Sequence, residues 1–235
     1  MKLRVLDSAH DAAHAAADHI AIAARYAVDA RHAFTIALSG GSTPLPMFDR
    51  LAASDVPWRH AHVFQTDERV APHGDPDRNL TALDEHLLSR IPVAEDQVHA
   101  MPVDGGDIEA NAVAYERTLR RIAGLPPILD VVHLGLGTDG HTASLVPGDR
   151  VVNVRDHEVA FSEAYQGRRR MTLTVPALDR ARQLVWLVCG SAKAGAVLRL
   201  LIADPAIPAA RIQLQRATLF VDRDAAALLE RDRLP

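Results

Sequence analysis

The segment Asp139-Gly140-His141-Thr142 carries the clearest chemical signal in the sequence. A histidine titrates near neutral pH and can act as a general base, while a neighbouring aspartate can orient its ring or hold a substrate. His141 ends a glycine-rich loop, residues 135–141, that follows an apolar run. A loop histidine that only satisfies backbone groups is the alternative interpretation. The position of the loop after an expected strand favours the catalytic interpretation.

A second glycine-rich segment carries three hydroxyl side chains and runs into a proline: Ser39-Gly40-Gly41-Ser42-Thr43-Pro44. Glycines allow a tight turn and a close approach to a ligand, and N–H groups at the start of a helix suit an anion such as phosphate. An ordinary strand-to-helix turn would use the same residues, so this segment alone leaves both interpretations open. It is not a Walker A loop, and it lacks the Gly-x-Gly-x-x-Gly spacing of a dinucleotide site.

Basic side chains near expected strand ends are candidates for binding an anion. Arg69, in Asp67-Glu68-Arg69, could pair with a phosphate in a bidentate fork, although a solvated charged turn is commoner. Residues 168–170 are three consecutive arginines. Lys193 is expected in the first turn of a helix, where the helix dipole disfavours a lysine and a bound anion would offset the cost. Exposed charges without a role are the alternative.

Apolar runs alternate with helical patterns along the chain. Strands are predicted at residues 34–38, 62–66, 130–135, 159–162, 171–175, 184–189 and 218–221. Helices are predicted at residues 8–31, 44–53, 79–89, 108–123 and 191–203. Ser8 is expected to cap the first helix and Asp224 a C-terminal one. The alternation predicts an α/β protein with a mostly parallel sheet, helices on both faces and a single domain over residues 1–235.

In such a sheet, ligands bind outside the carboxyl ends of the strands. The residues that follow the predicted strands are 39–43, 67–69, 135–141 and 190–193. These are also the segments richest in glycine and polar groups. The sequence therefore predicts one site at this edge of the sheet.

Composition limits the classes of protein that fit. The 235 residues are 48% hydrophobic and 24% charged, too apolar for a disordered chain. A net charge of −4 argues against a general nucleic-acid binder. The single cysteine, Cys189, excludes an internal disulfide, favours the reducing cytoplasm and is interpreted as a buried thiol. No apolar stretch of about 20 residues predicts a membrane span, and the N-terminus does not resemble a signal peptide.

Five segments together resemble the 6-phosphogluconolactonases, which share a superfamily with the glucosamine-6-phosphate deaminases. The matching segments are residues 39–44, 66–72, 135–145, 170–178 and 190–194. The resemblance implies a modified doubly wound α/β fold. It also implies hydrolysis of 6-phospho-D-glucono-1,5-lactone to 6-phosphogluconate in the oxidative pentose phosphate pathway, with no cofactor and no metal.

The resemblance also implies roles for particular residues. His141 would take a proton from the attacking water, and Asp139 would fix the ring and the substrate. The residues expected to bind the substrate and its phosphate are Gly40, Gly41, Ser42, Thr43, Asp67, Arg69, Asn79, Arg170 and Lys193. A phosphorylated sugar lactone is the expected partner, without nucleic acid or membrane, and the chain is expected to be a monomer or a small homo-oligomer.

Two other functions compete with this interpretation. A glucosamine-6-phosphate isomerase/deaminase is disfavoured by Val146, which stands where the deaminases carry a glutamate. A sugar-phosphate-sensing module without turnover is disfavoured by the intact Asp139 and His141, and by the lack of room for a helix-turn-helix. Two residues depart from the lactonase pattern. Val146 replaces a usual phenylalanine and is expected to change packing only. Arg78 replaces a frequent serine and is expected either to contact phosphate or to face water.

Overall fold

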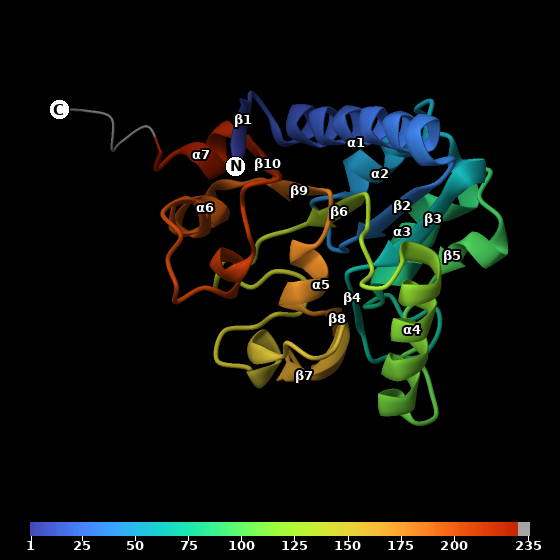
Figure 1. Cartoon of the computed structure of the whole chain (residues 1–235). Coiled ribbons are helices and arrows are strands. Elements are labelled where there is room, and N and C mark those ends of the chain that lie inside the picture. Colours follow the sequence, from blue (N-terminus) through green and yellow to red (C-terminus); the bar gives the residue numbers. More distant parts are fainter. Residues whose placement is uncertain (230–235) are drawn as a thin grey trace.

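A seven-stranded sheet, parallel at every neighbouring pair of strands, forms the centre of the molecule (Figure 1). The computed structural model describes residues 1–229 of the chain. The strand order is β1 (Lys2–Leu6), β10 (Ala217–Asp222), β9 (Gln183–Val188), β6 (Val131–Leu134), β2 (Phe34–Leu38), β3 (Ala61–Gln65) and β5 (Val98–His99). The inner strands β2, β6 and β9 are almost wholly buried, as expected for a sheet covered on both faces.

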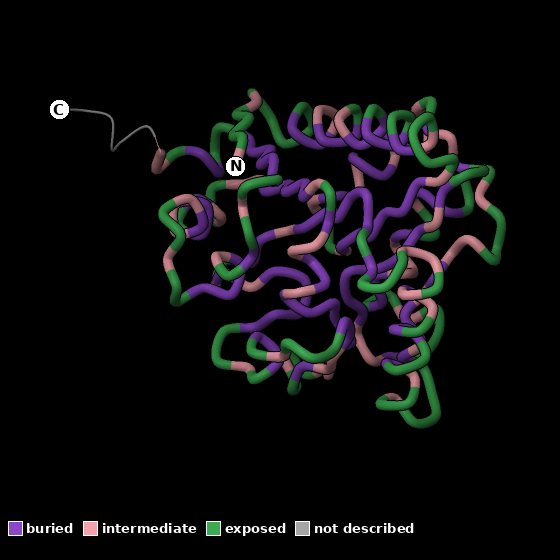
Figure 2. Tube along the Cα trace, in the orientation of Figure 1, coloured by how far each residue is buried: buried purple, intermediate pink, exposed green. Residues whose placement is uncertain are grey.

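Helices cover both faces of this sheet, and buried residues concentrate between the layers (Figure 2). The helices are α1 (Ala9–Arg31), α2 (Leu45–Ala52), α3 (Asn79–His86), α4 (Ile108–Ala123), α5 (Val175–Asp179), α6 (Ala194–Leu201) and α7 (Arg223–Ala226). Short 3-10 turns lie at Trp58–His60, Leu88–Arg90, Glu95–Gln97, Arg150–Asn153, Ser191–Lys193 and Pro208–Arg211. Val131 of β6 packs into the core under α1 and α2, whereas its neighbour Val132 packs into the core on the opposite face.

The long helix α1 packs closely on the sheet because its inner face is made mostly of alanine. Its side of the core includes Ala13, Ala16, Ala17 and Ala24, all completely buried. The Ser8 side chain accepts a hydrogen bond from the Asp11 N–H and so caps the first turn, as predicted.

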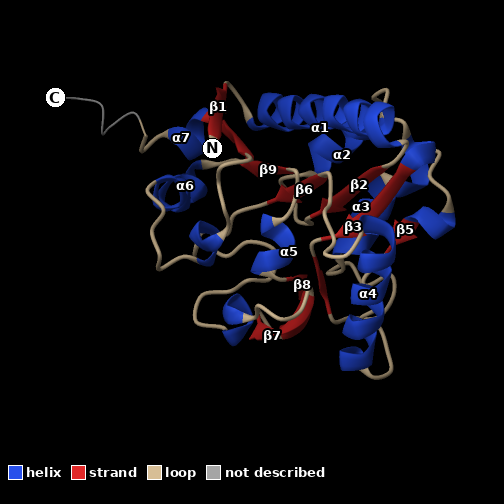
Figure 3. Ribbon diagram, in the orientation of Figure 1, coloured by secondary structure: helices blue, strands red, loops and turns tan. Residues whose placement is uncertain are grey.

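A second, three-stranded sheet lies beside the carboxyl ends of the central strands (Figure 3). It is antiparallel, with the order β4 (Asp67–Arg69), β8 (Arg168–Leu173) and β7 (Val159–Tyr165). Thr66 connects the two sheets. Its N–H donates to the Leu38 carbonyl in the central sheet, and its carbonyl accepts from the Leu173 N–H in the small sheet.

The predicted α/β class, with a mostly parallel sheet and helices on both faces, is confirmed. The predicted helix 108–123 and the predicted strand 34–38 have the observed bounds. The sequence did not predict strand β4, nor strands β1 and β5, which form the two edges of the central sheet. No helix among residues 1–229 combines the length and the apolar character needed to cross a membrane.

Several predicted element ends are wrong. The predicted helix 79–89 ends at His86, and the predicted strand 159–162 continues to Tyr165. The predicted strand 171–175 stops at Leu173, because helix α5 begins at Val175. The predicted helix 191–203 is a 3-10 turn followed by the shorter helix α6. The cap of the C-terminal helix α7 is Asp222 and not Asp224, since the Asp222 carboxylate accepts from the Ala225 N–H.

Candidate active site

The carboxyl ends of the central strands and the small sheet enclose a cavity of about 240 Å³. Every residue predicted to bind the substrate lines it, and so does His141. These are Gly40, Gly41, Ser42, Thr43, Asp67, Arg69, Asn79, His141, Arg170 and Lys193. Asp139 is not among the lining residues, but it contacts His141 directly. The structure thus brings the four predicted strand-end segments to one place.

Asp139 and His141 form a closely bonded pair. Oδ1 of Asp139 lies 2.6 Å from Nδ1 of His141 and also accepts from the His141 backbone N–H at 3.1 Å. A carboxylate against Nδ1 favours the tautomer with its proton on Nδ1 and leaves Nε2 free to accept one. Burial opposes ionisation of Asp139, but the hydrogen bonds from His141 outweigh it and hold the pKa of this carboxyl below its ordinary value.

The loop around the pair is tightly packed at Gly137. A Cβ at this position would overlap the His141 ring, so only glycine lets the loop fold back on the histidine. The Gly137 N–H donates to the His141 carbonyl at 2.8 Å, which closes the loop. The glycine-rich sequence therefore fixes the position of His141 at the cavity.

Three cationic side chains face the cavity from two directions. Arg69 and Arg170 come from paired positions on the small sheet, and Lys193 follows β9 of the central sheet. Arg170 is only 4% exposed, and its burial, reinforced by the charge of Arg69, lowers its pKa. Burial likewise lowers the pKa of Lys193. Like charges gathered in a half-buried space favour the binding of an anion.

Asp67 is held in place rather than free in the cavity. Its carboxylate accepts from the Ser144 hydroxyl at 2.7 Å and from the Thr66 hydroxyl at 3.1 Å. Asn79 holds the same strand, because its Nδ2 donates to the Asp67 carbonyl at 2.9 Å. Sequence reasoning missed Ser144, although it lies only three residues after His141.

Arg78 was expected either to contact phosphate or to face water, and the structure contradicts both expectations. The side chain is 3% exposed, and its Nε lies 3.0 Å from Oε2 of Glu68, which is fully buried. One guanidinium nitrogen donates to the Ala71 carbonyl at 3.0 Å. Arg78 therefore does not line this cavity and does not face bulk water; it lines a second cavity, described below. It neutralises a buried carboxylate behind β4.

The other two consecutive arginines also lie away from the cavity. Arg168 forms ion pairs with Asp75 and Asp77, and Arg169 pairs with Glu109. Among the three arginines at 168–170, only Arg170 lines the cavity. Alternation along β8 places Arg169 on the other face from Arg170, whereas Arg168 is held by its ion pairs with Asp75 and Asp77.

Two other lining residues, Cys189 and His133, have pKa values shifted by burial. Cys189 was predicted to be a buried strand thiol, but it follows the end of β9 and is only half-buried. Burial nevertheless raises the pKa of its thiol to about 12, so it is a poor nucleophile. His133 on β6 is 1% exposed, and neither ring nitrogen has a hydrogen-bond partner among the described residues. Burial lowers the pKa of His133 to about 3, so its ring is neutral. Among residues 1–229, no group of three or more His, Cys, Asp or Glu side chains is arranged to hold a metal ion.

Tyr165 is a contact of the Asp139–His141 pair that the sequence did not reveal. Its hydroxyl donates to Oδ2 of Asp139 at 2.9 Å, and its ring meets the His141 ring edge-on. The tyrosine lies 24 residues after His141, on a different sheet, and no motif marks it. Only the three-dimensional structure could identify it.

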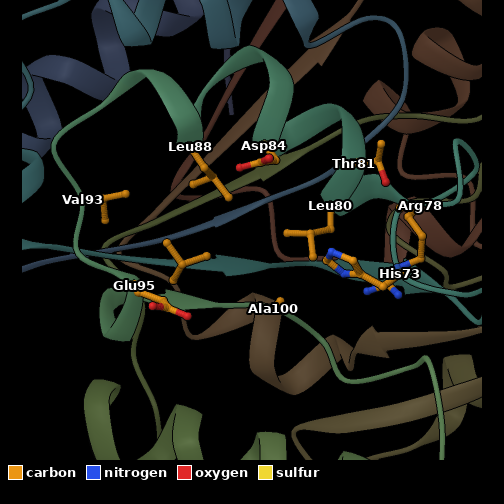
Figure 4. A pocket seen from close by; sticks show the side chains of 11 residues that line it. His73, Arg78, Leu80, Thr81, Asp84, Leu88, Val93, Glu95 and Ala100 are labelled. Atoms are coloured by element: carbon orange, nitrogen blue, oxygen red, sulfur yellow. The ribbon is translucent and has the colours of Figure 1, made fainter.

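A larger cavity of about 500 Å³ lies between α3 and β5 (Figure 4). Its lining includes the apolar side chains of Leu80, Leu88 and Val98 and the carboxylates of Asp84 and Glu95. It shares no lining residue with the first cavity and contains none of the predicted site residues.

The observed arrangement defines an α/β protein with a cavity lined by three cationic side chains at the carboxyl edge of its sheet. The chain belongs to the family of glucosamine-6-phosphate isomerases/6-phosphogluconolactonase, whose model matches residues 7–221.

Relatives and solved structures agree with this family. The 6-phosphogluconolactonase of Synechocystis sp. is 39% identical over 194 residues, which cover 80% of each chain. The 6-phosphogluconolactonase of Mycobacterium tuberculosis is 39% identical over 217 residues, covering 86% of this chain and 88% of the relative. The structure of 6-phosphogluconolactonase from Trypanosoma cruzi has a TM-score of 0.85 and 27% identity, covering 97% of this chain and 96% of that one.

Proposed function

We propose that this protein hydrolyses 6-phospho-D-glucono-1,5-lactone to 6-phosphogluconate, a step of the oxidative pentose phosphate pathway. One observation carries the proposal: the Asp139–His141 pair opens on the same cavity as a glycine-rich loop and three cations. A base and an anion site side by side suit a substrate that has both a reactive carbonyl and a phosphate. Relatives named 6-phosphogluconolactonase, 39% identical over most of the chain, support the same choice.

His141 is the general base in this proposal. Its free Nε2 takes a proton from water as the water oxygen bonds to the lactone carbonyl carbon. The tetrahedral intermediate then breaks its bond to the ring oxygen, and His141 returns the proton to that oxygen. Asp139 stabilises the imidazolium between these steps. Catalysis of this kind typically contributes about 10²–10⁴-fold to the rate.

The phosphate binds beside the base, where the three cationic side chains and the glycine-rich loop line the same cavity. Gly41, Ser42 and Thr43 offer backbone N–H groups and hydroxyls at the start of α2, and Arg170 and Lys193 supply charge. Arg69 adds a second guanidinium beside Arg170. Binding energy from the phosphate then positions the carbonyl against His141.

The site fits the alternatives less well. At Val146 the deaminases of this superfamily carry a glutamate. Here the side chain is an apolar one, 7% exposed, and cannot assist ring opening. A sensor without turnover has no need for a bonded histidine–aspartate pair.

We further propose one domain of this family over residues 1–235, a cytoplasmic location, and a monomer or small homo-oligomer that binds neither nucleic acid nor membranes.

A paired assay on the purified protein tests this function. One arm follows loss of 6-phosphogluconolactone above its spontaneous hydrolysis, and the other follows ammonia release from glucosamine 6-phosphate. We expect rapid lactone loss and no ammonia. Ammonia release would replace the proposal with the deaminase, and binding of sugar phosphate without turnover in either arm would replace it with the sensor.

A further inference from the structure

The hairpin of β7 and β8 supplies Arg170 to the cavity and has an irregular register. Residues 166–167 have φ values of 54° and 82°, as in a two-residue type I′ turn. Tyr165 pairs with Arg168 across this turn, and further along Ser162 pairs with Arg170. Between these two pairs β7 has two residues and β8 has one, which constitutes a β-bulge.

The bulge determines which way the Tyr165 side chain points. In a regular strand, a residue three positions after Ser162 would lie on the opposite face of the sheet. The extra residue returns Tyr165 to the face that carries Arg170. The guanidinium carbon of Arg170 lies 4.9 Å from the centroid of the Tyr165 ring, and Nη2 of Arg170 donates to Oε1 of Gln166 at 3.0 Å. The hairpin tip therefore supports the arginine.

The other end of the tyrosine reaches the catalytic pair. Its hydroxyl donates to Oδ2 of Asp139 at 2.9 Å and lies 3.5 Å from Nδ1 of His141. Oδ1 of Asp139 already bonds His141, so Tyr165 occupies the second oxygen of the carboxylate. The two rings of Tyr165 and His141 meet at 63° with centroids 5.3 Å apart. Both oxygens of Asp139 are thus oriented by aromatic side chains.

We propose that Tyr165 is a positioning residue that links the anion-binding Arg170 to the Asp139–His141 pair. Its ring supports the guanidinium by a cation–π contact, and its hydroxyl orients the carboxylate that holds His141. One side chain thereby fixes the relative placement of the group that binds the phosphate and the group that acts on the carbonyl. This inference rests on the proposed function.

Substitutions can separate the role of the Tyr165 ring from the role of its hydroxyl. Tyr165→Phe keeps the ring against Arg170 and removes only the hydroxyl. We expect kcat to fall about 10-fold, as for loss of one hydrogen bond to a charged group, with KM within about 2-fold of wild type. The Asp139 carboxylate then has one donor fewer and attracts the His141 imidazolium more strongly. The acid limb of kcat/KM therefore moves to higher pH.

Tyr165→Leu removes the ring as well. We expect the same loss of kcat, together with a rise in KM of about 2- to 5-fold from the lost cation–π contact. Tyr26→Phe is the matched control, since Tyr26 is 69% exposed on α1, and it should leave every parameter unchanged. Thermal unfolding of each variant verifies that it is folded before its kinetics are compared.

A Tyr165→Phe enzyme with wild-type kcat and a wild-type pH profile would overturn the proposal, as would equal rises of KM in the two variants. NMR titration of the His141 ring separates this outcome from failure of the proposed function, because it needs no turnover. If the wild-type protein hydrolyses no lactone, an upward shift of the His141 titration in Tyr165→Phe still supports the link, and an unchanged titration overturns it.

Discussion

The side chain of Asn79 lies directly against the α-carbon of Gly40, so that a Cβ at Gly40 would overlap the Asn79 amide. Asn79 begins α3, and its backbone N–H donates to the buried Glu68 at 2.7 Å. Gly40 belongs to the loop between β2 and α2. This contact joins the glycine-rich loop to the strand that carries Asp67 and Arg69, and it explains why glycine is needed at a position without positive φ.

Gly40→Ala should therefore destabilise the protein by about 1–3 kcal/mol, because the methyl group displaces Asn79 or the loop. Gly135→Ala is the matched control. Gly135 lines the same cavity, but a Cβ there would meet no atom within 4 Å. Chemical denaturation of the two variants measures the difference in the free energy of unfolding. Equal stabilities would show that the Asn79 contact has no energetic role.

His141→Asn should lower kcat by about 10²–10⁴-fold and leave KM nearly unchanged, because the asparagine cannot accept a proton from water. Steady-state kinetics with 6-phosphogluconolactone measure both constants. His60→Asn is the control, since His60 is exposed and precedes β3 at its amino end, whereas the cavity lies at the carboxyl ends of the strands. A His141→Asn variant with normal kcat would remove His141 from the mechanism.

Lys193 can be tested by chemical labelling, because Lys2 and Lys193 are the only lysines in the sequence. A bound phosphate should hide the Lys193 amine from acetic anhydride. We expect 6-phosphogluconate to slow acetylation of Lys193 several-fold and to leave the exposed Lys2 unaffected, as measured by mass spectrometry of the peptides. Equal labelling of Lys193 with and without the compound would contradict its role in binding.

Arg78→Met should cost about 3–5 kcal/mol of stability, because it leaves the fully buried Glu68 without its cation. Arg59→Met removes an exposed arginine and should cost less than about 0.5 kcal/mol. Urea denaturation compares the two variants. A small effect at Arg78 would mean that the backbone N–H groups around Glu68 stabilise its charge unaided.

His133 should make the protein less stable in acid. Its folded-state pKa of about 3 lies below the unfolded value of 6.5, so between these pH values the unfolded chain binds a proton that the folded chain excludes. Stability therefore falls as pH decreases through this window, by up to about 1.4 kcal/mol per pH unit for this one group. His99, with a pKa of about 4 caused mainly by burial, adds to the slope.

His133→Leu should remove the contribution of this ring to the acid slope and raise stability near neutral pH, because buried unpaired nitrogens are replaced by methyl groups. Unfolding free energies measured between pH 4 and 7 test this, with His60→Leu as the exposed control. A slope identical to that of the wild type would show that the folded protein accommodates the protonated His133 ring.

Much of the site was predictable because its residues follow strands in short motifs. The carboxyl ends of parallel strands meet at one edge, so His141, Ser42 and Lys193 could be placed together from their sequence positions alone. Tyr165 could not, since a bulge in β7 reverses the face of its side chain and nothing in the sequence marks it. Arg78 was misjudged because its partner, Glu68, seemed part of a solvated turn.

The strands and the helix cap that the sequence did not predict have similar causes. Strand β1 is short, mostly exposed and rich in polar residues, and β5 has only two residues, so neither shows an apolar run. Asp222 and Asp224 both have side chains that can cap a helix. The choice depends on where β10 ends, which is set by its pairing with β9 and β1.

Thr66, which bonds to both sheets, has a consequence for the thermodynamics of ligand binding. Lys193, which follows a strand of the central sheet, and Arg170, on the small sheet, both line the cavity. Main-chain hydrogen bonds at Thr66 fix these two sheets relative to each other. Much of the ordering of these walls is therefore completed when the chain folds. Association with an anion then loses little backbone entropy, and its free energy is available for orienting the bound molecule.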